Sequence, residues 1–201
     1  MRCCGSLLWP PSFLRSPASD LLIAAVGAFL GWLGVSTIVL ADGRRGLAAG
    51  LAVATAGLAA IAWQNGDGVA AVIVLIGGGA AAVLRYRAGP GGWAMMPPGS
   101  TPRLIMCVAG GLVALWFAAS VTTGSGGATR FAVLSVIGLS GARIVSSREP
   151  SSVVTAVAVL ALSAAIATHL GAGSPGLWPY VAAALVAAAA PLVPVRVANA
   201  S

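Results

Sequence analysis

Arg130 and Arg143 flank a single apolar stretch, and an arginine in such a place could bind an anion inside a membrane. Only the 12 residues Phe131–Ala142 separate them, and a helix of that length spans about 18 Å against about 30 Å of bilayer hydrocarbon. Either both guanidinium groups reach opposite interfaces through their long stems, or one of them is buried among helices and marks an anion pathway. The two arginines are therefore the candidate intramembrane polar site. Hydroxyl groups that could share it belong to Thr122, Thr123, Ser135 and Ser140.

Of the two outcomes, we expect snorkelling to the interfaces. Arg148 follows five residues after Arg143 and can already supply positive charge at that helix end. On this interpretation Arg143 is an orientation charge, and replacing it by glutamine would have little effect.

Other groups that could catalyse a reaction do not converge in the sequence. The acidic residues all lie in tails or loops, whereas a proton relay needs an ionisable group inside a span; they are Asp20, Asp42, Asp67 and Glu149. A Ser–His–Asp arrangement would have to recruit His169 and Asp67 from separate loops. Cys3 and Cys4 are adjacent, Cys107 lies in an apolar stretch, and a metal needs two to four converging ligands. We therefore expect no catalytic, cofactor-binding or metal-binding residues, and a protein that is not an enzyme.

The elements that must position the arginines are seven apolar stretches. The chain is 59% hydrophobic and only 7% charged, and each stretch reaches or approaches the roughly 17–25 residues of a membrane span. Backbone groups in hydrocarbon must be paired within their own segment, so the stretches are predicted to be helices. They cover Leu21–Ala41, Gly46–Trp63, Gly68–Leu84, Leu104–Val121, Thr129–Val145, Val153–His169 and Leu177–Val195. The predicted fold is an all-α polytopic membrane bundle.

The eleven basic residues are all arginine and predict an orientation. Eight fall on one side of the bundle and three on the other, so the positive-inside rule places the N-terminus outside and the C-terminus in the cytoplasm. The eight are Arg44, Arg45, Arg85, Arg87, Arg103, Arg143, Arg148 and Arg196; the three are Arg2, Arg15 and Arg130. Because the charges are spread over helix ends instead of one face, nucleic acid is not an expected partner. An aromatic belt is expected near the outer ends, from Trp63, Trp116, Trp178 and Tyr180.

The domain organisation predicted is one transmembrane domain over residues 21–196, an irregular tail over 1–20 and a short tail over 197–201. The first helix could instead be a cleaved signal peptide, but its apolar run exceeds the roughly 7–15 residues of a signal sequence. The lack of lysine and abundance of alanine, glycine and valine suggest a bacterial coding bias. We expect a multi-pass protein of the inner (plasma) membrane, with the lipid bilayer as its partner.

Small residues indicate how the helices pack. After the first helix the chain forms three hairpins, which are either a true repeat or a consequence of the orientation rule. Gly27 and Gly31, and then Gly46 and Gly50, follow the small-xxx-small spacing that lets two helix backbones approach closely. These glycines pack the bundle internally or form a contact with other membrane subunits or a second copy. The first helix, outside the hairpin pattern, is the expected contact face.

The segment Arg103–Pro194 has a layout shared with a known family. It opens on Arg103-Leu-Ile, ends its second helix in GARIVSSR from Gly141 to Arg148, and continues into a further hairpin with a short outer turn. This layout is similar to the later transmembrane hairpins of the integral membrane component of type VII secretion, the EccD family. That family also carries a cytoplasmic ubiquitin-like domain, which is not found in this sequence. The resemblance implies a membrane-embedded role in a secretion assembly.

These observations favour a non-enzymatic integral membrane component of a transport or secretion assembly. The alternative is a stand-alone permease or channel for a small neutral or anionic solute. The permease hypothesis requires a polar path that uses Arg130 or Arg143, whereas the assembly hypothesis requires a surface that fits a partner.

Overall fold

The computed structural model describes residues 17–88, 92–93, 101–121, 126–147, 149–172 and 176–192. Seven α-helices and a 3-10 turn make up most of this part of the chain. They are α1 (Pro17–Leu40), α2 (Arg44–Gln64), α3 (Gly68–Arg87), α4 (Thr101–Val121), α5 (Gly127–Ser146), α6 (Pro150–Ala172), α7 (Trp178–Ala189) and the 3-10 helix η2 (Ala190–Leu192).

Six of the seven helices, α1 to α6, are long and apolar enough to cross a membrane. The predicted all-α membrane bundle is confirmed, and the chain is a multi-pass integral membrane protein that contacts lipid. The seventh helix is shorter, because its α-helical part ends at Ala189 and Pro191 falls in the 3-10 turn that follows. The side of the membrane on which each terminus lies stays a prediction.

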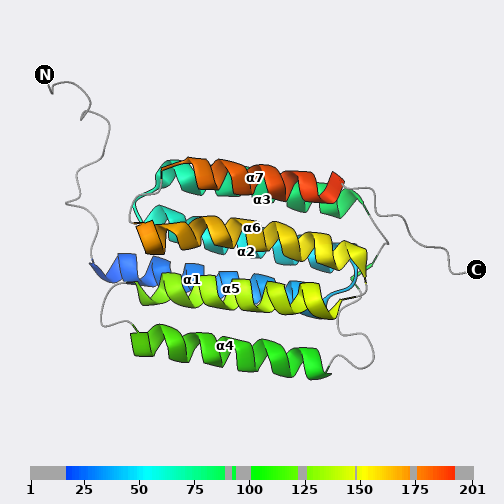
Figure 1. The fold of residues 1–201 in the computed structure, drawn as a ribbon, viewed down its shortest axis with the longest axis horizontal. Helices are drawn as coiled ribbons and strands as arrows, with labels where there is room; N and C mark the ends of the chain where they lie inside the picture. Colours follow the sequence, from blue (N-terminus) through cyan, green and yellow to red (C-terminus); the bar gives the residue numbers. More distant parts are fainter. Residues whose placement is uncertain are drawn as a thin grey trace, which may run out of the picture.

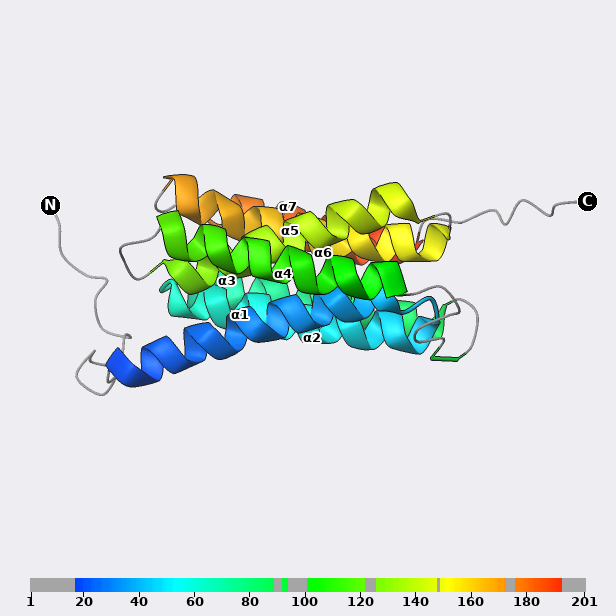
Figure 2. The same ribbon diagram turned by 90° about the horizontal axis from the view of Figure 1, so that it is seen from below.

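The helices form two layers that run along one axis (Figures 1 and 2). One layer contains α7, α6, α5 and α4 in that spatial order, and the other contains α3, α2 and α1. Across the layers α3 packs on α7, α2 on α6 and α1 on α5. The four-helix layer contains one helix more than the other layer, so α4 lies at its edge, against α5 and the side of α1.

Helix edges differ from the predicted bounds in one place that matters. Residues 17–20, expected to be irregular, form the first turn of α1, which begins at Pro17. Proline is tolerated at a first helical position, because its missing N–H would have no partner there. The remaining residues of the predicted tails lie outside the described part of the chain, and the single-domain organisation stays a prediction.

The core between the layers consists mainly of small aliphatic side chains. Residues with no exposed surface include Val35, Leu47, Leu58, Val136 and Leu162. Alanine and glycine separate them, so helix backbones come close enough for dispersion forces to hold the layers together where lipid removes the hydrophobic drive. A β-carbon on Gly27 would lie 3.1 Å from the α2 backbone, and one on Gly50 would lie 2.8 Å from the α1 backbone. A β-carbon on Gly31 would make only an ordinary contact, at 3.7 Å.

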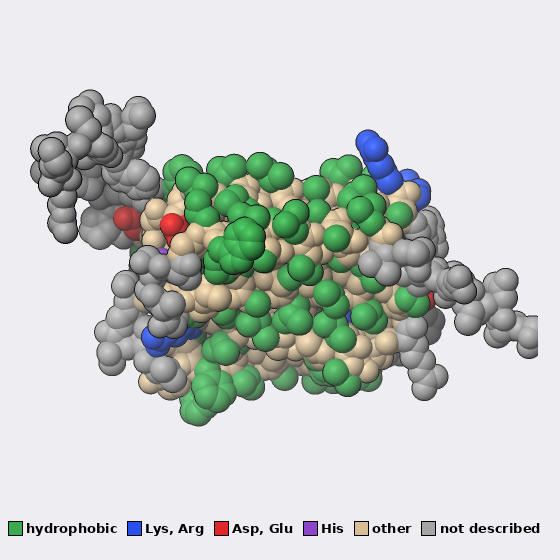
Figure 3. Space-filling model, turned by 45° about the horizontal axis from the view of Figure 1, so that its top comes forward, with side chains coloured by type: hydrophobic (Ala, Val, Ile, Leu, Met, Phe, Trp, Pro, Cys, Tyr) green, Lys and Arg blue, Asp and Glu red, His purple; other side chains and the backbone are tan. Residues whose placement is uncertain are grey.

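The outer surface is apolar along most of its length. In Figure 3 hydrophobic side chains cover the middle of the visible face, and charged side chains gather toward the two ends of the long axis. Trp63, Trp116 and Trp178 are exposed, as expected of belt residues, but Tyr180 is buried and does not belong to such a belt. We call one end the arginine-rich end; it contains the last residues of α1, α3 and α5 and the first residues of α2, α4 and α6.

Candidate functional site

Arg143 lies inside the bundle at the arginine-rich end. Its side chain is 1% exposed, which makes it the largest fully buried side chain of the described residues. The expectation that it snorkels to the interface is therefore wrong. The reason is its place on α5, because Ala132, Val136 and Leu139 occupy the same buried helix face at intervals of three and four residues.

A short turn between α1 and α2 supplies the anion that Arg143 needs. Nη2 of Arg143 donates to Oδ1 of Asp42 and, at 3.2 Å, to the carbonyl oxygen of Ala41. Gly43 in this turn packs closely against Gly92 and Trp93, because a β-carbon on it would come within 2.5 Å of the Gly92 carbonyl oxygen.

Side chains from two further helices form hydrogen bonds with the Asp42 carboxylate or the Arg143 guanidinium. Nη2 of Arg143 also donates to the buried Oγ of Ser152 on α6 at 3.0 Å. Nη1 of Arg103, in the first turn of α4, donates to Oδ2 of Asp42 at 3.0 Å. We call Asp42, Arg103, Arg143 and Ser152 the ionic clamp. It ties together the α1–α2 turn and helices α4, α5 and α6.

The Asp42 carboxylate in the ionic clamp is a fixed charge that does not exchange protons near neutral pH. Burial raises the pKa of Asp42, but hydrogen bonds from Arg143 and Arg103 and their positive charges outweigh burial and bring this pKa below its ordinary value. The carboxylate therefore stays ionised at physiological pH. Such a group holds helices in place, and it cannot serve as the carrier of a proton-coupled transporter.

We expect acid to remove what Asp42 contributes to stability. Its pKa is lower in the folded than in the unfolded chain, so the contribution is complete above the unfolded value of 3.8 and is lost as pH falls through the folded pKa. Wild type should therefore be more stable than Asp42→Asn at neutral pH, and the difference should shrink as the pH falls below 3.8. Thermal denaturation in detergent across this range measures it. A pH-independent difference would contradict the assignment.

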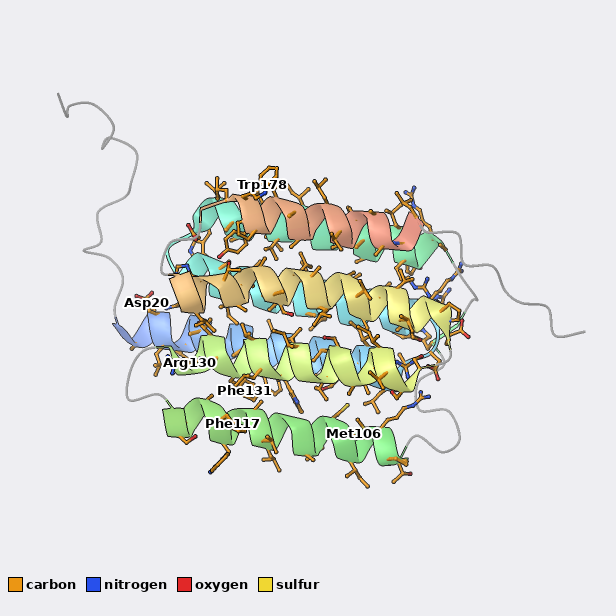
Figure 4. All side chains as sticks on the ribbon, viewed as in Figure 1. Asp20, Met106, Phe117, Arg130, Phe131 and Trp178 are labelled. Carbon is orange, nitrogen blue, oxygen red and sulfur yellow. The ribbon has the colours of Figure 1, made fainter. Side chains whose placement is uncertain are left out.

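Arg130, the second candidate, lies at the opposite end of the bundle from Arg143. Figure 4 shows it at the start of α5, with Asp20 of α1 at the same end. The two predicted arginines therefore do not form one site. Ser135 and Ser140, which could have shared the site, donate to carbonyl groups of their own helix; Thr122 and Thr123 lie outside the described residues.

His169 and Asp67 come closer than the sequence indicates. Nδ1 of His169 is 3.8 Å from Oδ2 of Asp67, a distance too long for a hydrogen bond, and Nδ1 has no other partner. The pair lies at the end opposite to the ionic clamp. In the described part of the chain no three His, Cys, Asp or Glu side chains converge as metal ligands would; Cys3 and Cys4 are outside that part.

A groove between α4 and α5 is a second feature of the membrane-facing surface. It has a volume of about 490 Å³, and an almost wholly apolar lining that includes Met106, Phe117, Ser135, Gly138 and Ala142. Met106 and Phe117 lie toward the two ends of α4 (Figure 4). Phe117 is eleven positions after Met106, so the groove extends over about 16 Å of helix. Small residues of α5 form part of its wall.

Comparison of the chain with protein-family models, curated proteins and solved structures finds no match.

Proposed function

We propose that this protein is a non-enzymatic membrane component of a transport or secretion assembly, and that the groove between α4 and α5 receives a transmembrane helix of a partner subunit. The observation that carries the proposal is the placement of α4. Only 22% of its membrane-spanning window is buried, less than in any other helix of spanning length described. On α5, the groove-lining residues Leu134 and Gly138 are exposed, so neighbouring helices do not cover α5 at this point.

The packing of α4 supports the proposal, because the helix is held firmly although little of it is buried. Arg103 anchors its first turn to Asp42, and the indole N–H of Trp32 on α1 donates to the carbonyl oxygen of Cys107 at 3.3 Å. A helix fixed at the edge of the layer keeps the groove open. The earlier expectation that the first helix is the contact face fits less well, since α1 packs between α2 and α5.

The lining of the groove fits a helix better than it fits a solute. Glycine and other small residues at a helix surface allow a second backbone to approach closely, which favours helix association in lipid. A β-carbon on Gly138 would meet no atom within 4 Å, so the groove has room at this point. The groove offers few polar groups to a solute, because the Ser135 hydroxyl is already bonded to Ala132.

We expect Gly138→Leu to release the partner subunit. The leucine side chain fills open space, so the fold is kept, but it occupies the groove that a partner helix would need. The matched control is Gly141→Leu on the same helix, where a β-carbon also meets nothing within 4 Å but the residue does not line the groove. Tagged protein purified from its own host in mild detergent, with mass and subunit composition measured, tests this.

The expected result is a stoichiometric second polypeptide with wild type and Gly141→Leu, reduced at least about tenfold with Gly138→Leu. A tenfold loss corresponds to a binding free energy that is less favourable by about 1.4 kcal/mol. Monomeric wild-type protein, or an assembly that contains only this chain, would contradict the proposal. Localisation to the inner membrane, with the arginine-rich end in the cytoplasm, belongs to the same proposal and follows from the arginine distribution.

The second candidate function is a permease for a small anionic solute. Its support is the burial of arginine nitrogen atoms without hydrogen-bond partners, which include Nε of Arg143. The hydroxyl groups of the core argue against a permease. Those of Thr55, Ser140 and Thr155 donate to carbonyl groups of their own helices and do not line a continuous path. Anion flux through liposomes that contain this chain alone would favour the permease.

A further inference from the structure

Arg85, in the last turn of α3, is a buried cation without a counter-ion in contact. Its side chain is 6% exposed, and both Nε and Nη2 lack a hydrogen-bond partner. Arg143 provides the contrast at the same end of the bundle, because that guanidinium has Asp42, Ser152 and the Ala41 carbonyl as acceptors. The two buried arginines differ in that one is paired by the chain and the other is not.

A buried guanidinium without acceptors is unstable unless something else pairs it. Arginine stays protonated in proteins, so Arg85 cannot relieve the loss of solvent by becoming neutral. Leaving its N–H groups unpaired carries the full desolvation penalty of a charged donor. Glu149, before the first residue of α6, attracts Arg85 electrostatically but does not form an ion pair with it within the described residues.

The surroundings of Arg85 add positive charge. A β-carbon on Gly78 would press against the Thr55 side chain, so the α3 face that carries Gly78 and Arg85 is turned toward α2. Seven residues, or two helix turns, separate Gly78 from Arg85 and keep them on one face. Arg44 begins α2 at the same end, and its Nε is also buried without a partner. Six described arginines and two described acidic residues lie at the arginine-rich end, which leaves this end strongly positive.

We infer that Arg85 is the centre of a binding site for a phosphate group at the arginine-rich end, with Arg44 as a second cation. Nε and Nη2 of Arg85, both buried and without a hydrogen-bond partner, are the two parallel N–H donors with which a planar guanidinium binds two oxygens of a phosphate. The phosphate belongs to a lipid headgroup or to a free phosphate ion. The inference is independent of the α4–α5 groove and of any partner subunit.

A groove beside the site suits the lipid source. Its volume is about 490 Å³, and its lining includes Arg45, Ala48, Ala82, Tyr86 and Trp93. Arg44 and Arg85 do not line this groove, but their chain neighbours Arg45 and Tyr86 do, so the groove lies at the same level of the bundle. Its alanine wall suits an acyl chain, and the tyrosine and tryptophan are residue types enriched at headgroup depth.

The test uses the full chain, delipidated in a neutral detergent, with binding measured from the rise in unfolding temperature. Phosphatidylglycerol, phosphatidylcholine and inorganic phosphate are titrated separately. Stabilisation by both phospholipids or by phosphatidylglycerol, without an effect of inorganic phosphate, assigns the site to a lipid headgroup. Stabilisation by inorganic phosphate assigns it to the free ion. No stabilisation by any of the three overturns the inference.

The matched variants are Arg85→Gln and Arg87→Gln, which remove the same charge from the same helix turn but from a buried and an exposed position. We expect Arg85→Gln to weaken binding at least about tenfold, as loss of a charge-assisted hydrogen bond predicts, and Arg87→Gln to bind like wild type. Equal weakening by both would show a diffuse charge effect and overturn the site. If Arg85→Gln does not fold, Arg85→Lys keeps the charge without the planar fork; reduced binding supports the site, and unchanged binding overturns it.

Discussion

Replacing Arg143 by glutamine should destabilise the bundle by about 3 kcal/mol, the lower part of the range for breaking a buried ion pair. The substitution removes the donor that serves Asp42, Ser152 and the Ala41 carbonyl, and the last two are fully buried. Asp42 is partly exposed and keeps Arg103, which is why the loss should not reach the upper part of the range. SDS-induced unfolding in mixed micelles measures the free energy of unfolding.

The matched control for this prediction is Arg103→Gln. Arg103 binds the other oxygen of the same carboxylate, but its side chain is 35% exposed and water can replace it. Ion pairs of this kind contribute less than about 1 kcal/mol. Arg143→Lys should recover only part of the loss, because an ammonium group lacks the planar fork. Similar small effects of Arg143→Gln and Arg103→Gln would show that Arg143 acts only as an orientation charge and would contradict this prediction.

Helix positions could be predicted from the sequence because each depends on the length and hydrophobicity of one continuous segment. The bilayer sets the length of an apolar segment, and the backbone in lipid has to be helical. All seven predicted stretches correspond to helices, with ends that differ by a few residues except at the last stretch, of which residues 193–195 lie outside the described part. The predicted hairpin partners α2 and α3, α4 and α5, and α6 and α7 do pack side by side.

The ionic clamp could be predicted only in part. The short spacing between Arg130 and Arg143 pointed to α5, and the periodicity of Ala132, Val136 and Leu139 would have placed Arg143 on the buried face. Asp42 could not be identified as its partner, because 101 residues separate the two. Their contact depends on α1 packing against α5 across the two layers, and hydrophobic pattern alone does not determine which helices are neighbours.

The small-xxx-small spacing identified only some of the glycines at the contact between α1 and α2. Gly27 and Gly50 lie at the contact, but the tightest approach involves Gly34 and Gly57, which the small-xxx-small spacing did not select. The β-carbon position of Gly34 is 2.2 Å from the backbone nitrogen of Ala54, and that of Gly57 is 2.4 Å from the backbone nitrogen of Gly31. Backbone atoms cannot move aside as a flexible side chain can, so any larger residue at these positions separates the helices.

Gly34→Ala should therefore destabilise the protein by about 2 kcal/mol or more. The added methyl group would lie 2.2 Å from a backbone nitrogen, so its overpacking cost lies at the upper end of about 1–3 kcal/mol or above. The better helix propensity of alanine returns at most about 1 kcal/mol. Unfolding in mixed micelles measures the change, and a cysteine pair across α1 and α2 would report any increase in their separation.

Gly31→Ala is the control that isolates the close approach from the glycine itself. It lies on the same helix one turn earlier, and its added β-carbon would meet Val136 and Ala132 at 3.7 and 3.8 Å, which are ordinary contacts. The same substitution should there be neutral or stabilising by up to about 1 kcal/mol, because only the propensity gain remains. Destabilisation by Gly34→Ala but not by Gly31→Ala would show that the backbone contact with Ala54 fixes the α1–α2 spacing. Equal effects at both positions would mean that α1 shifts freely along α2, and the rigid placement of the Asp42 turn beside Arg143 would then need another cause.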